Sequence, residues 1–159
     1  MQATVGISEM RVSNNPDDVL VTYSLGSCIG VAFYDEKVQV GGLVHIMLPL
    51  SRIDPRKAQD VPCMFADTGI PHILHAMFDM GAEKKRIIAK VAGAAKLLDN
   101  KNTFRIGERN RIVLRKILWK NNILISAEDT GGSIARTMFL DIGSGRVHLK
   151  AKGQHYDLA

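Results

Sequence analysis

The chain has 159 residues, of which 46% are hydrophobic, 23% charged and 6% aromatic. A chain of this length can bury a sizeable core without a disulfide or metal scaffold, so we expect one domain over residues 1–159. Lysine and arginine number 21 against 16 aspartate and glutamate residues, and the net charge of +5 favours acidic partners without assigning a function.

Nothing in the sequence indicates export or membrane insertion. Charged residues soon follow the N-terminus, so no secretion signal is visible there. Lys90 and Lys96 interrupt the most apolar stretch, which is too short to cross a bilayer of about 30 Å. Cys28 and Cys63 then fit a reducing compartment in which thiols stay free. We therefore expect a cytoplasmic protein.

The first elements predicted along the chain are strands. Residues 19–23 are β-branched and aromatic and end at a Leu-Gly pair, which is typical of a strand. Residues 29–34 and 38–48 are apolar runs on either side of a polar turn, so they predict a hairpin. This hairpin carries Cys28 at its entrance and His45 near its exit.

A loop and a helix are predicted next. Residues 50–62 contain two prolines and scattered charges without periodicity, which indicates an exposed loop that could cover a site. Pro71 is expected to open a helix and Gly81 to close it in a left-handed cap. The apolar face of this helix would consist of Ile70, Ile73, Leu74, Met77 and Met80.

Further strands and a second helix are predicted in the second half of the chain. Residues 87–91 predict a buried strand leading to Gly93, and residues 107–119 predict a helix with one basic side. Its apolar stripe would be Val113, Leu114, Ile117 and Leu118. A strand over 123–127 and a hairpin of 138–142 with 146–150 follow. Because strands cluster at both ends with helices between them, an α+β fold is favoured over a βαβ repeat.

Cys28 is the strongest candidate for chemistry. It follows Leu25-Gly26-Ser27, and a glycine turn can aim backbone N–H groups and a nucleophile at one point. A thiol reacts as its thiolate and needs a base, and His45 lies 17 residues away on the paired strand. The alternatives are a small buried core cysteine and a hydrogen-bonded core histidine. The pair favours a Cys-His hydrolase or transferase over these alternatives.

Other polar residues have weaker functional interpretations. A metal could be bound at helical spacing by His72, His75 and Asp79. A solvated helix face is the better interpretation of these residues. We therefore predict no metal and no cofactor. Glu128 and Asp129 could form a catalytic pair, although the following Thr-Gly-Gly favours turn capping.

Arg136, Cys63 and the basic segments each have a functional and a structural interpretation. Arg136 could bind an acidic group or pair on the surface, and Cys63 is expected to be a bystander unless it pairs reversibly with Cys28. The basic second helix and residues 84–86 could suggest nucleic-acid binding. One Trp and three Tyr offer little stacking surface, so we expect no nucleic-acid partner.

Six segments resemble, in order and approximate spacing, the motifs of the chemoreceptor glutamine deamidase CheD family. They are VTYSLGSC (21–28), VHIMLP (44–49), FADT (65–68), KVAGAA (90–95), IGERN (106–110) and AEDTGG (127–132). The resemblance runs over nearly the whole chain. It implies a cytoplasmic chemotaxis enzyme that converts glutamine side chains on receptor helices to glutamate with release of ammonia. The fold it implies is an α+β domain built round a β-sandwich, similar to the catalytic domain of cytotoxic necrotising factor toxins.

The resemblance also implies roles for individual residues. The family's nucleophile falls on Cys28, its histidine on His45 and its orienting threonine on Thr22. We expect Thr22 to accept a hydrogen bond from the imidazole through its hydroxyl or its backbone carbonyl. Backbone N–H groups near Gly26 and Ser27 are the candidate oxyanion donors.

Two partners follow from the resemblance as well. The substrate would be the cytoplasmic helices of chemoreceptors, toward which a basic face would steer the protein. A phosphatase of the CheC type would be a second partner. The alternative to an enzyme is a regulatory binding subunit that engages receptors or CheC with little or no turnover.

Overall fold

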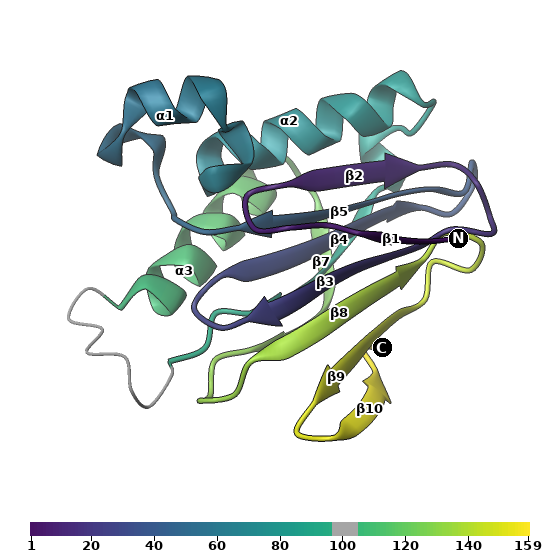
Figure 1. Cartoon of the computed structure of the whole chain (residues 1–159). Coiled ribbons are helices and arrows are strands. Elements are labelled where there is room, and N and C mark those ends of the chain that lie inside the picture. Colours follow the sequence, from purple (N-terminus) through teal and green to yellow (C-terminus); the bar gives the residue numbers. More distant parts are fainter. Residues whose placement is uncertain (97–104) are drawn as a thin grey trace.

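The computed structural model describes residues 1–96 and 105–159. They form two five-stranded sheets packed face to face, with helices covering the outer face of one sheet (Figure 1). The α+β class predicted from the sequence, with two sheets flanked by helices, is confirmed. No helix in the described part of the chain is long and apolar enough to span a membrane.

The first sheet has the strand order β1-β3-β8-β9-β10. Its strands are β1 (Gln2–Thr4), β3 (Val19–Leu25), β8 (Arg136–Asp141), β9 (Val147–Ala151) and β10 (Gln154–Asp157). β1 pairs parallel to β3, and the other neighbours are antiparallel. The sequence predicted β3, β8 and β9 but not the two edge strands, which are three and four residues long and too short for a period-2 pattern to emerge.

The second sheet has the order β2-β5-β4-β6-β7. Its strands are β2 (Met10–Ser13), β4 (Ile29–Asp35), β5 (Val40–Ile46), β6 (Ile88–Gly93) and β7 (Leu124–Thr130). The hairpin β4–β5, predicted from the sequence, pairs in register from Ile29↔Ile46 to Asp35↔Val40. Every residue of both strands is buried, because one face of this sheet packs on the first sheet and the other on helices.

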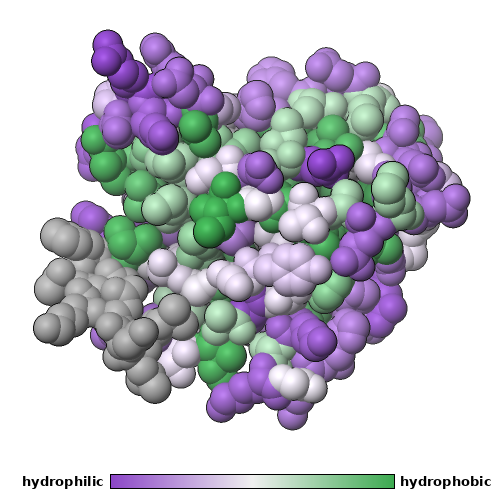
Figure 2. Space-filling view, viewed as in Figure 1, coloured by the Kyte–Doolittle hydropathy of each residue, from purple (hydrophilic) through white to green (hydrophobic). Residues whose placement is uncertain are grey.

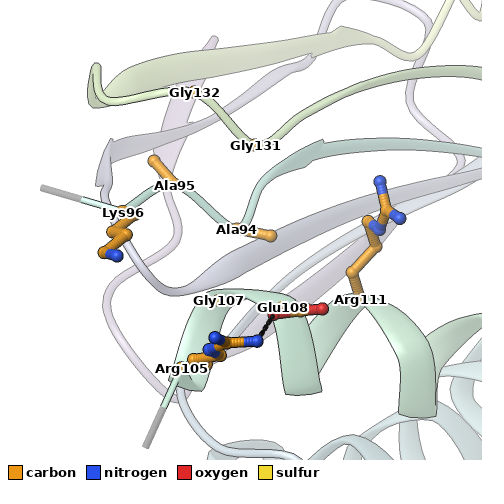
Figure 3. A pocket seen from close by; sticks show the side chains of 9 residues that line it. All are labelled: Ala94, Ala95, Lys96, Arg105, Gly107, Glu108, Arg111, Gly131 and Gly132. Carbon is orange, nitrogen blue, oxygen red and sulfur yellow. Dashed lines mark ion pairs between the residues drawn. The ribbon is translucent and has the colours of Figure 1, made fainter. Parts of the chain in front are cut away.

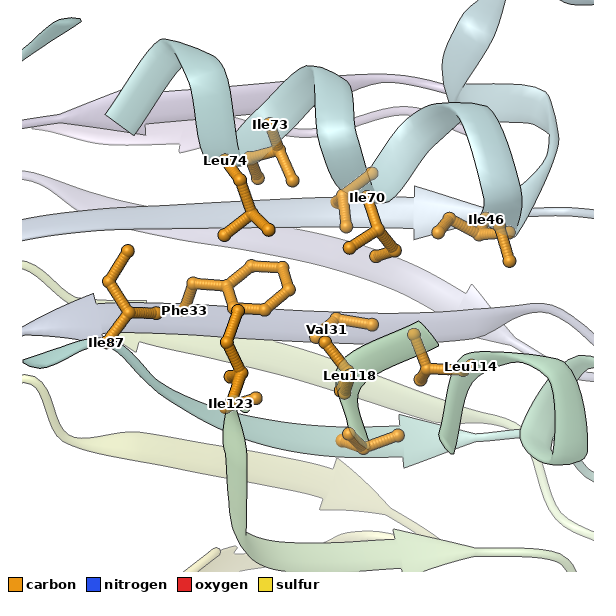
Figure 4. Packing of buried hydrophobic residues seen from close by; sticks show 14 of the residues in the cluster. Val31, Phe33, Ile46, Ile70, Ile73, Leu74, Ile87, Leu114, Leu118 and Ile123 are labelled. Atoms are coloured by element: carbon orange, nitrogen blue, oxygen red, sulfur yellow. The ribbon is translucent and has the colours of Figure 1, made fainter. Parts of the chain in front are cut away.

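Two separate apolar cores reflect these layers. Between the sheets, Leu20, Leu43 and Leu140 pack with their neighbours. Between the second sheet and the helices lies a larger core (Figure 4). It receives α2 (Ala66–Asp79) through Ile70, Ile73, Leu74 and Met77, and α3 (Ile106–Lys120) through Leu114 and Leu118.

The helices differ from the sequence prediction in two places. α2 begins at Ala66, so Pro71 lies inside it rather than at its start. The first turn buries Ala66 and Ile70, and this packing outweighs the hydrogen bond that Pro71 cannot donate. The predicted C-terminal cap at Gly81 is confirmed, with φ +98°. Met80 was expected on the buried face but is 37% exposed.

The segment predicted as an exposed loop is partly helical. It contains α1 (Pro55–Asp60), which the Asp54 side chain caps by accepting a hydrogen bond from Lys57 N at 3.1 Å. Short 3-10 turns at Ser51–Ile53 and Pro62–Met64 flank it. In Figure 2 hydrophilic residues gather at the upper left, where α1 lies in Figure 1. The predicted exposure is confirmed for most of the segment, whereas the prediction of a loop without helical structure is wrong.

Candidate active site

Cys28 lies in the tight connection between β3 and β4, just before Ile29. The chain reverses here because Ser24 adopts a left-handed conformation, with φ +58°, and Gly26 N donates to Ser24 O at 2.9 Å. The Cys28 side chain is half-buried and packs against the core between the two sheets. Its thiol therefore faces the first sheet.

Neighbouring segments hold this turn in place through its carbonyl groups. Each of the three carbonyls at 26–28 accepts a hydrogen bond: Ala95 N to Gly26 O at 2.8 Å, Asn110 Nδ2 to Ser27 O at 3.0 Å, and Ala94 N to Cys28 O at 2.8 Å. Gly93 comes so close that an added Cβ would lie 2.5 Å from Cys28 O, and its φ is +106°. Only glycine fits at that position, as the sequence suggested for a close backbone approach.

His45 and Thr22 meet across the interface between the sheets. Leu43 and His45 alternate with the helix-facing residues of β5, so the imidazole points toward the first sheet. Thr22 is fully buried on β3, and its Oγ1 lies 2.7 Å from His45 Nδ1. The structure thus places the threonine hydroxyl, rather than its backbone carbonyl, against the ring.

The surroundings of Thr22 determine the tautomer of His45. Thr22 Oγ1 also donates a hydrogen bond to Val5 O at 2.7 Å, and a carbonyl can only accept. With its single proton used there, the hydroxyl oxygen accepts from His45 Nδ1–H. In the neutral imidazole the other nitrogen, Nε2, then carries the lone pair. Nε2 is buried and has no hydrogen-bond partner among the described groups.

Cys28 and His45 lie on the same face of the second sheet. Gly30 is the residue paired with His45, so Cys28 sits diagonally across the hairpin from the imidazole. The two side chains make no direct hydrogen bond in this structure, because Nε2 is without a partner. Hydrogen bonds between catalytic groups are often long or poorly aligned in the absence of substrate and tighten when substrate binds.

Burial keeps both groups uncharged. It raises the pKa of the Cys28 thiol above its ordinary value, and a hydrogen bond from the backbone N–H of Cys28 offsets only part of that effect. Burial also lowers the pKa of His45 to about 4. At neutral pH the pair is therefore a thiol and a neutral imidazole, whose Nε2 carries a lone pair.

The candidate oxyanion donors differ in availability. Gly26 N–H is engaged by Ser24 O within the turn. The backbone N–H of Cys28 hydrogen-bonds to its own sulfur, so it lies beside the atom that would attack a carbonyl group. Cys28 N–H is therefore a further candidate donor beside Ser27 N–H, and the role of both stays a prediction.

A cavity of about 340 Å³ lies beside Ala94 and Ala95, the residues whose N–H groups bond to this turn (Figure 3). Ala94, Ala95, Gly131 and Gly132 form one side, and the first turns of α3 form the other. Neither Cys28 nor His45 lines it. The cavity therefore adjoins the backbone that supports the turn but is separate from the reacting groups.

The acidic residues and the arginine named above as weaker candidates form ion pairs with neighbouring side chains. Glu128 pairs with Arg115 at 2.8 Å, whereas Asp129 pairs with Arg136 at 3.2 Å, so each carboxylate has its own arginine. Arg136 is buried, and it also donates to Gly93 O and Gly131 O rather than binding a ligand on the surface.

Three other sets of residues lie away from the site. No group of three or more histidine, cysteine or acidic side chains is arranged for a metal within residues 1–96 and 105–159. His75 instead contacts Phe78 edge to face. Cys63 is buried in the core under α2, and burial raises its pKa to about 11. Arg86, part of the basic run 84–86, bonds to Asp35.

No role was predicted for Asn110 from the sequence, although this residue ends the segment IGERN (106–110). Asn110, Leu114 and Leu118 lie four residues apart and all three are fully buried on α3. A polar residue continuing an apolar stripe was the signal that could have drawn attention to it.

The chain matches the family model described as CheD chemotactic sensory transduction over residues 47–151. It is 56% identical to "Probable chemoreceptor glutamine deamidase CheD 1" of Syntrophus aciditrophicus over 149 residues, covering 94% of this chain and 93% of that protein. It is 48% identical to "Probable chemoreceptor glutamine deamidase CheD" of Solibacter usitatus, covering 99% and 93%.

Among solved structures, a hypothetical protein YfiH of Bacillus licheniformis is similar with a TM-score of 0.43 and 14% identity. The match covers 78% of this chain and 49% of that chain, so this protein spans about half its length. A likeness at this level supports no conclusion about function, and the likeness to the necrotising-factor toxins stays a prediction. The family match and the curated relatives, which span almost the full chain, confirm the family inferred from the motifs: the chain belongs to the CheD family.

Proposed function

We propose that this chain, acting as one domain over residues 1–159, deamidates glutamine side chains of chemoreceptors through the Cys28 thiol. The observation that carries the proposal is the Thr22–His45 pair. The hydroxyl holds Nδ1 at 2.7 Å and leaves Nε2 buried on the same sheet face as Cys28, with no hydrogen-bond partner in the part of the chain that the structure describes. The names of the relatives state the same activity for those proteins and support the substrate class.

The mechanism follows from the protonation states. His45 Nε2 takes the proton of the Cys28 thiol as the sulfur attacks the carboxamide carbon, and a tetrahedral oxyanion forms. The C–N bond then breaks, and the imidazolium returns its proton to the leaving ammonia. Water, deprotonated by the same Nε2, then attacks the thioester carbon. The C–S bond breaks, which releases the glutamate side chain, and the imidazolium returns the proton to the Cys28 sulfur. The sum is glutamine plus water giving glutamate plus ammonia.

Each surrounding group has a distinct task in this scheme. The Thr22 hydroxyl fixes the ring and the tautomer, and it donates its own hydrogen bond to Val5 O. The Cys28 N–H and Ser27 N–H stabilise the oxyanion, an interaction for which one donor typically contributes about 3 kcal/mol of barrier lowering. The chemistry needs no metal or cofactor.

The partners and location belong to the same proposal. The exposed side of α3 carries Arg109, Lys116 and Lys120, a basic surface that would attract acidic receptor helices in the cytoplasm. Association with receptor should therefore weaken as salt rises, because exposed charges are screened. A CheC-type phosphatase is the second proposed partner.

A second candidate function is a binding subunit with little or no turnover. The observation that favours it is the resting state of the site, where the thiol is protonated and makes no hydrogen bond to His45. Such a protein would use the same surface to engage receptors or CheC. Both candidates predict binding, but only the first requires the thiol.

The deciding experiment incubates a purified receptor cytoplasmic domain with the protein and scores glutamine-to-glutamate conversion by peptide mass spectrometry. Cys28→Ala should abolish conversion, whereas Cys63→Ala, which removes the other thiol, should retain it. If the intact protein binds the receptor and converts no glutamine, the binding-subunit function takes precedence and the proposed chemistry is wrong for that substrate.

A further inference from the structure

Asn110 is a buried amide at a position where the neighbouring pattern is apolar. It lies one turn before Leu114 on the face of α3 that packs on the second sheet, and none of its surface is exposed. Burying an amide is unfavourable unless its polar atoms find partners. Its contacts therefore decide what it does.

The amide nitrogen of Asn110 makes two hydrogen bonds to backbone carbonyls. Nδ2 donates to Ser27 O at 3.0 Å and to Met47 O at 3.1 Å. Both partners are acceptors, so the NH₂ group and not the oxygen must face them. The orientation of the side chain is set by its surroundings.

These two carbonyls lie just beyond the hairpin that carries the reacting groups. The register of β4 and β5 ends at Ile29↔Ile46, so no ladder pairing continues to Cys28 on one strand or Met47 on the other. Asn110 bonds to the residue before Cys28 and to the residue two after His45. A single side chain thus bridges the two strand ends where the ladder no longer holds them.

The amide oxygen of Asn110 indicates a functional use for this residue. Asn110 Oδ1 is buried and has no hydrogen-bond partner among the described groups. An unpartnered buried acceptor opposes folding and cancels part of what the two donated bonds contribute. An apolar side chain of the same size would fill this position without that penalty. Stability alone is therefore a poor explanation for an amide here.

We propose that Asn110 is a positioning residue for the deamidation reaction, holding the Cys28 turn and the His45 strand end at the separation that proton transfer requires. It acts through the carbonyls of Ser27 and Met47 and touches neither the thiol nor the imidazole. This inference rests on the proposed function, because it assigns Asn110 a task in that same chemistry.

The test compares Asn110→Leu and Asn110→Asp with a control on the same helix. Both substitutions keep the side-chain size; leucine removes the donor, and a carboxylate in its place repels both carbonyls. Leu114→Ala disturbs the same buried face one turn further along without touching the site. Each protein is scored for its melting temperature, for kcat and KM on a receptor fragment, and for the pH profile of Cys28 alkylation by iodoacetamide.

We expect Asn110→Leu to lower kcat about 100-fold with KM little changed, the size of effect that a small misplacement of reacting groups produces. The pH profile of alkylation should shift because the thiol loses its set relation to His45. Leu114→Ala should lower the melting temperature at least as much and keep both kcat and the profile. Asn110→Asp, measured below its melting temperature, should reproduce the kcat loss.

The proposal is overturned if the folded Asn110 variants retain kcat and the wild-type alkylation profile. It is also overturned if Leu114→Ala loses activity in the same proportion to its loss of stability. Alkylation needs no receptor, so this readout still decides the positioning role if the intact protein converts no glutamine. Failure of the proposed function and failure of this inference are therefore distinguishable.

Discussion

The two ends of strand β4 each carry a buried polar cluster, and the clusters differ in how completely their atoms are bonded. At the far end lies Asp35, with no exposed surface. Its carboxylate accepts hydrogen bonds from Lys37 N at 3.1 Å, Glu83 N at 2.9 Å and Arg86 Nε at 3.0 Å. Burial opposes its charge, but these bonds and Arg86 outweigh burial and lower the pKa of Asp35.

The near end, with Thr22, His45 and Asn110, is left incomplete. Both His45 Nε2 and Asn110 Oδ1 are buried there and have no hydrogen-bond partner within residues 1–96 and 105–159. Buried polar atoms are normally satisfied, so an unpartnered atom requires a reason. We infer that the complete cluster stabilises the fold, whereas the incomplete cluster leaves His45 Nε2 free to act as the base in the proposed deamidation. Substitutions at the two ends should separate stability from activity.

The largest stability effect is expected for Asp35→Ala at the far end. Removing one partner of a buried, hydrogen-bonded pair typically destabilises a protein by about 3–5 kcal/mol, and Arg86 keeps 20% exposure, which places this case at the lower end. Denaturant unfolding measures the loss. Deamidation per folded molecule should be unchanged, and a matching loss of activity would show that the two ends are coupled.

The next effect is a pH dependence that belongs to the near end. The pKa of His45 is about 4 in the folded protein and 6.5 in the unfolded chain. The unfolded chain binds more protons between these values, so the free energy of unfolding decreases as pH falls from 6.5 through 4. The contribution lost is about 3 kcal/mol. Asp35, with its lowered pKa, loses its contribution only below its ordinary value of 3.8.

Unfolding of wild type and His45→Asn at pH 7 and pH 4.5 measures this dependence. The variant should lose less stability on acidification than wild type. Burial, His155 and Arg146 lower the pKa of His148 as well, but that group is present in both proteins and cancels in the difference. Equal pH dependence in the two proteins would mean that His45 does not carry the effect.

Thr22→Val should lower kcat about 100-fold, because a methyl group cannot accept the hydrogen bond from Nδ1 that orients the ring of His45. This factor is at the lower end of what an oriented general base contributes. Tyr34→Phe is the matched control. It removes another buried hydroxyl, bonded to Ile142 O at 2.7 Å, away from the reacting groups. Both variants should be destabilised by about 1 kcal/mol, and only the first should lose turnover. Near-normal kcat in Thr22→Val would remove the hydroxyl from the mechanism.

The smallest effect is expected for Cys63→Ala. This thiol is 4% exposed in the core under α2, so its loss should destabilise the protein by about 1 kcal/mol through packing. Activity and the rate of Cys28 alkylation should not change. Faster loss of activity under oxidising conditions in wild type than in the variant would instead indicate pairing of the two cysteines, which thiol counting would detect.

Patterns within short stretches predicted most of the elements correctly. β-branched and aromatic runs marked β3 and the β4–β5 hairpin, and the apolar stripe of α3 marked that helix through Leu114 and Leu118. Each of these signals depends on neighbours along the chain. The start of α2 was wrong because burial of Ala66 and Ile70 overrides the local preference of Pro71. That burial is a property of the assembled layers.

The family, the α+β class and the hairpin that carries His45 and follows Cys28 could be predicted from the sequence alone, because each follows from local composition or from motifs in order. Folding of the two sheets onto each other was needed to bring the hydroxyl of Thr22 to Nδ1 and to leave Nε2 with no partner among the described groups. The tertiary structure also placed Asn110 against two carbonyls 83 and 63 residues away in the chain. Contacts between such distant residues depend on how sheets and helices stack, and no local pattern encodes that geometry.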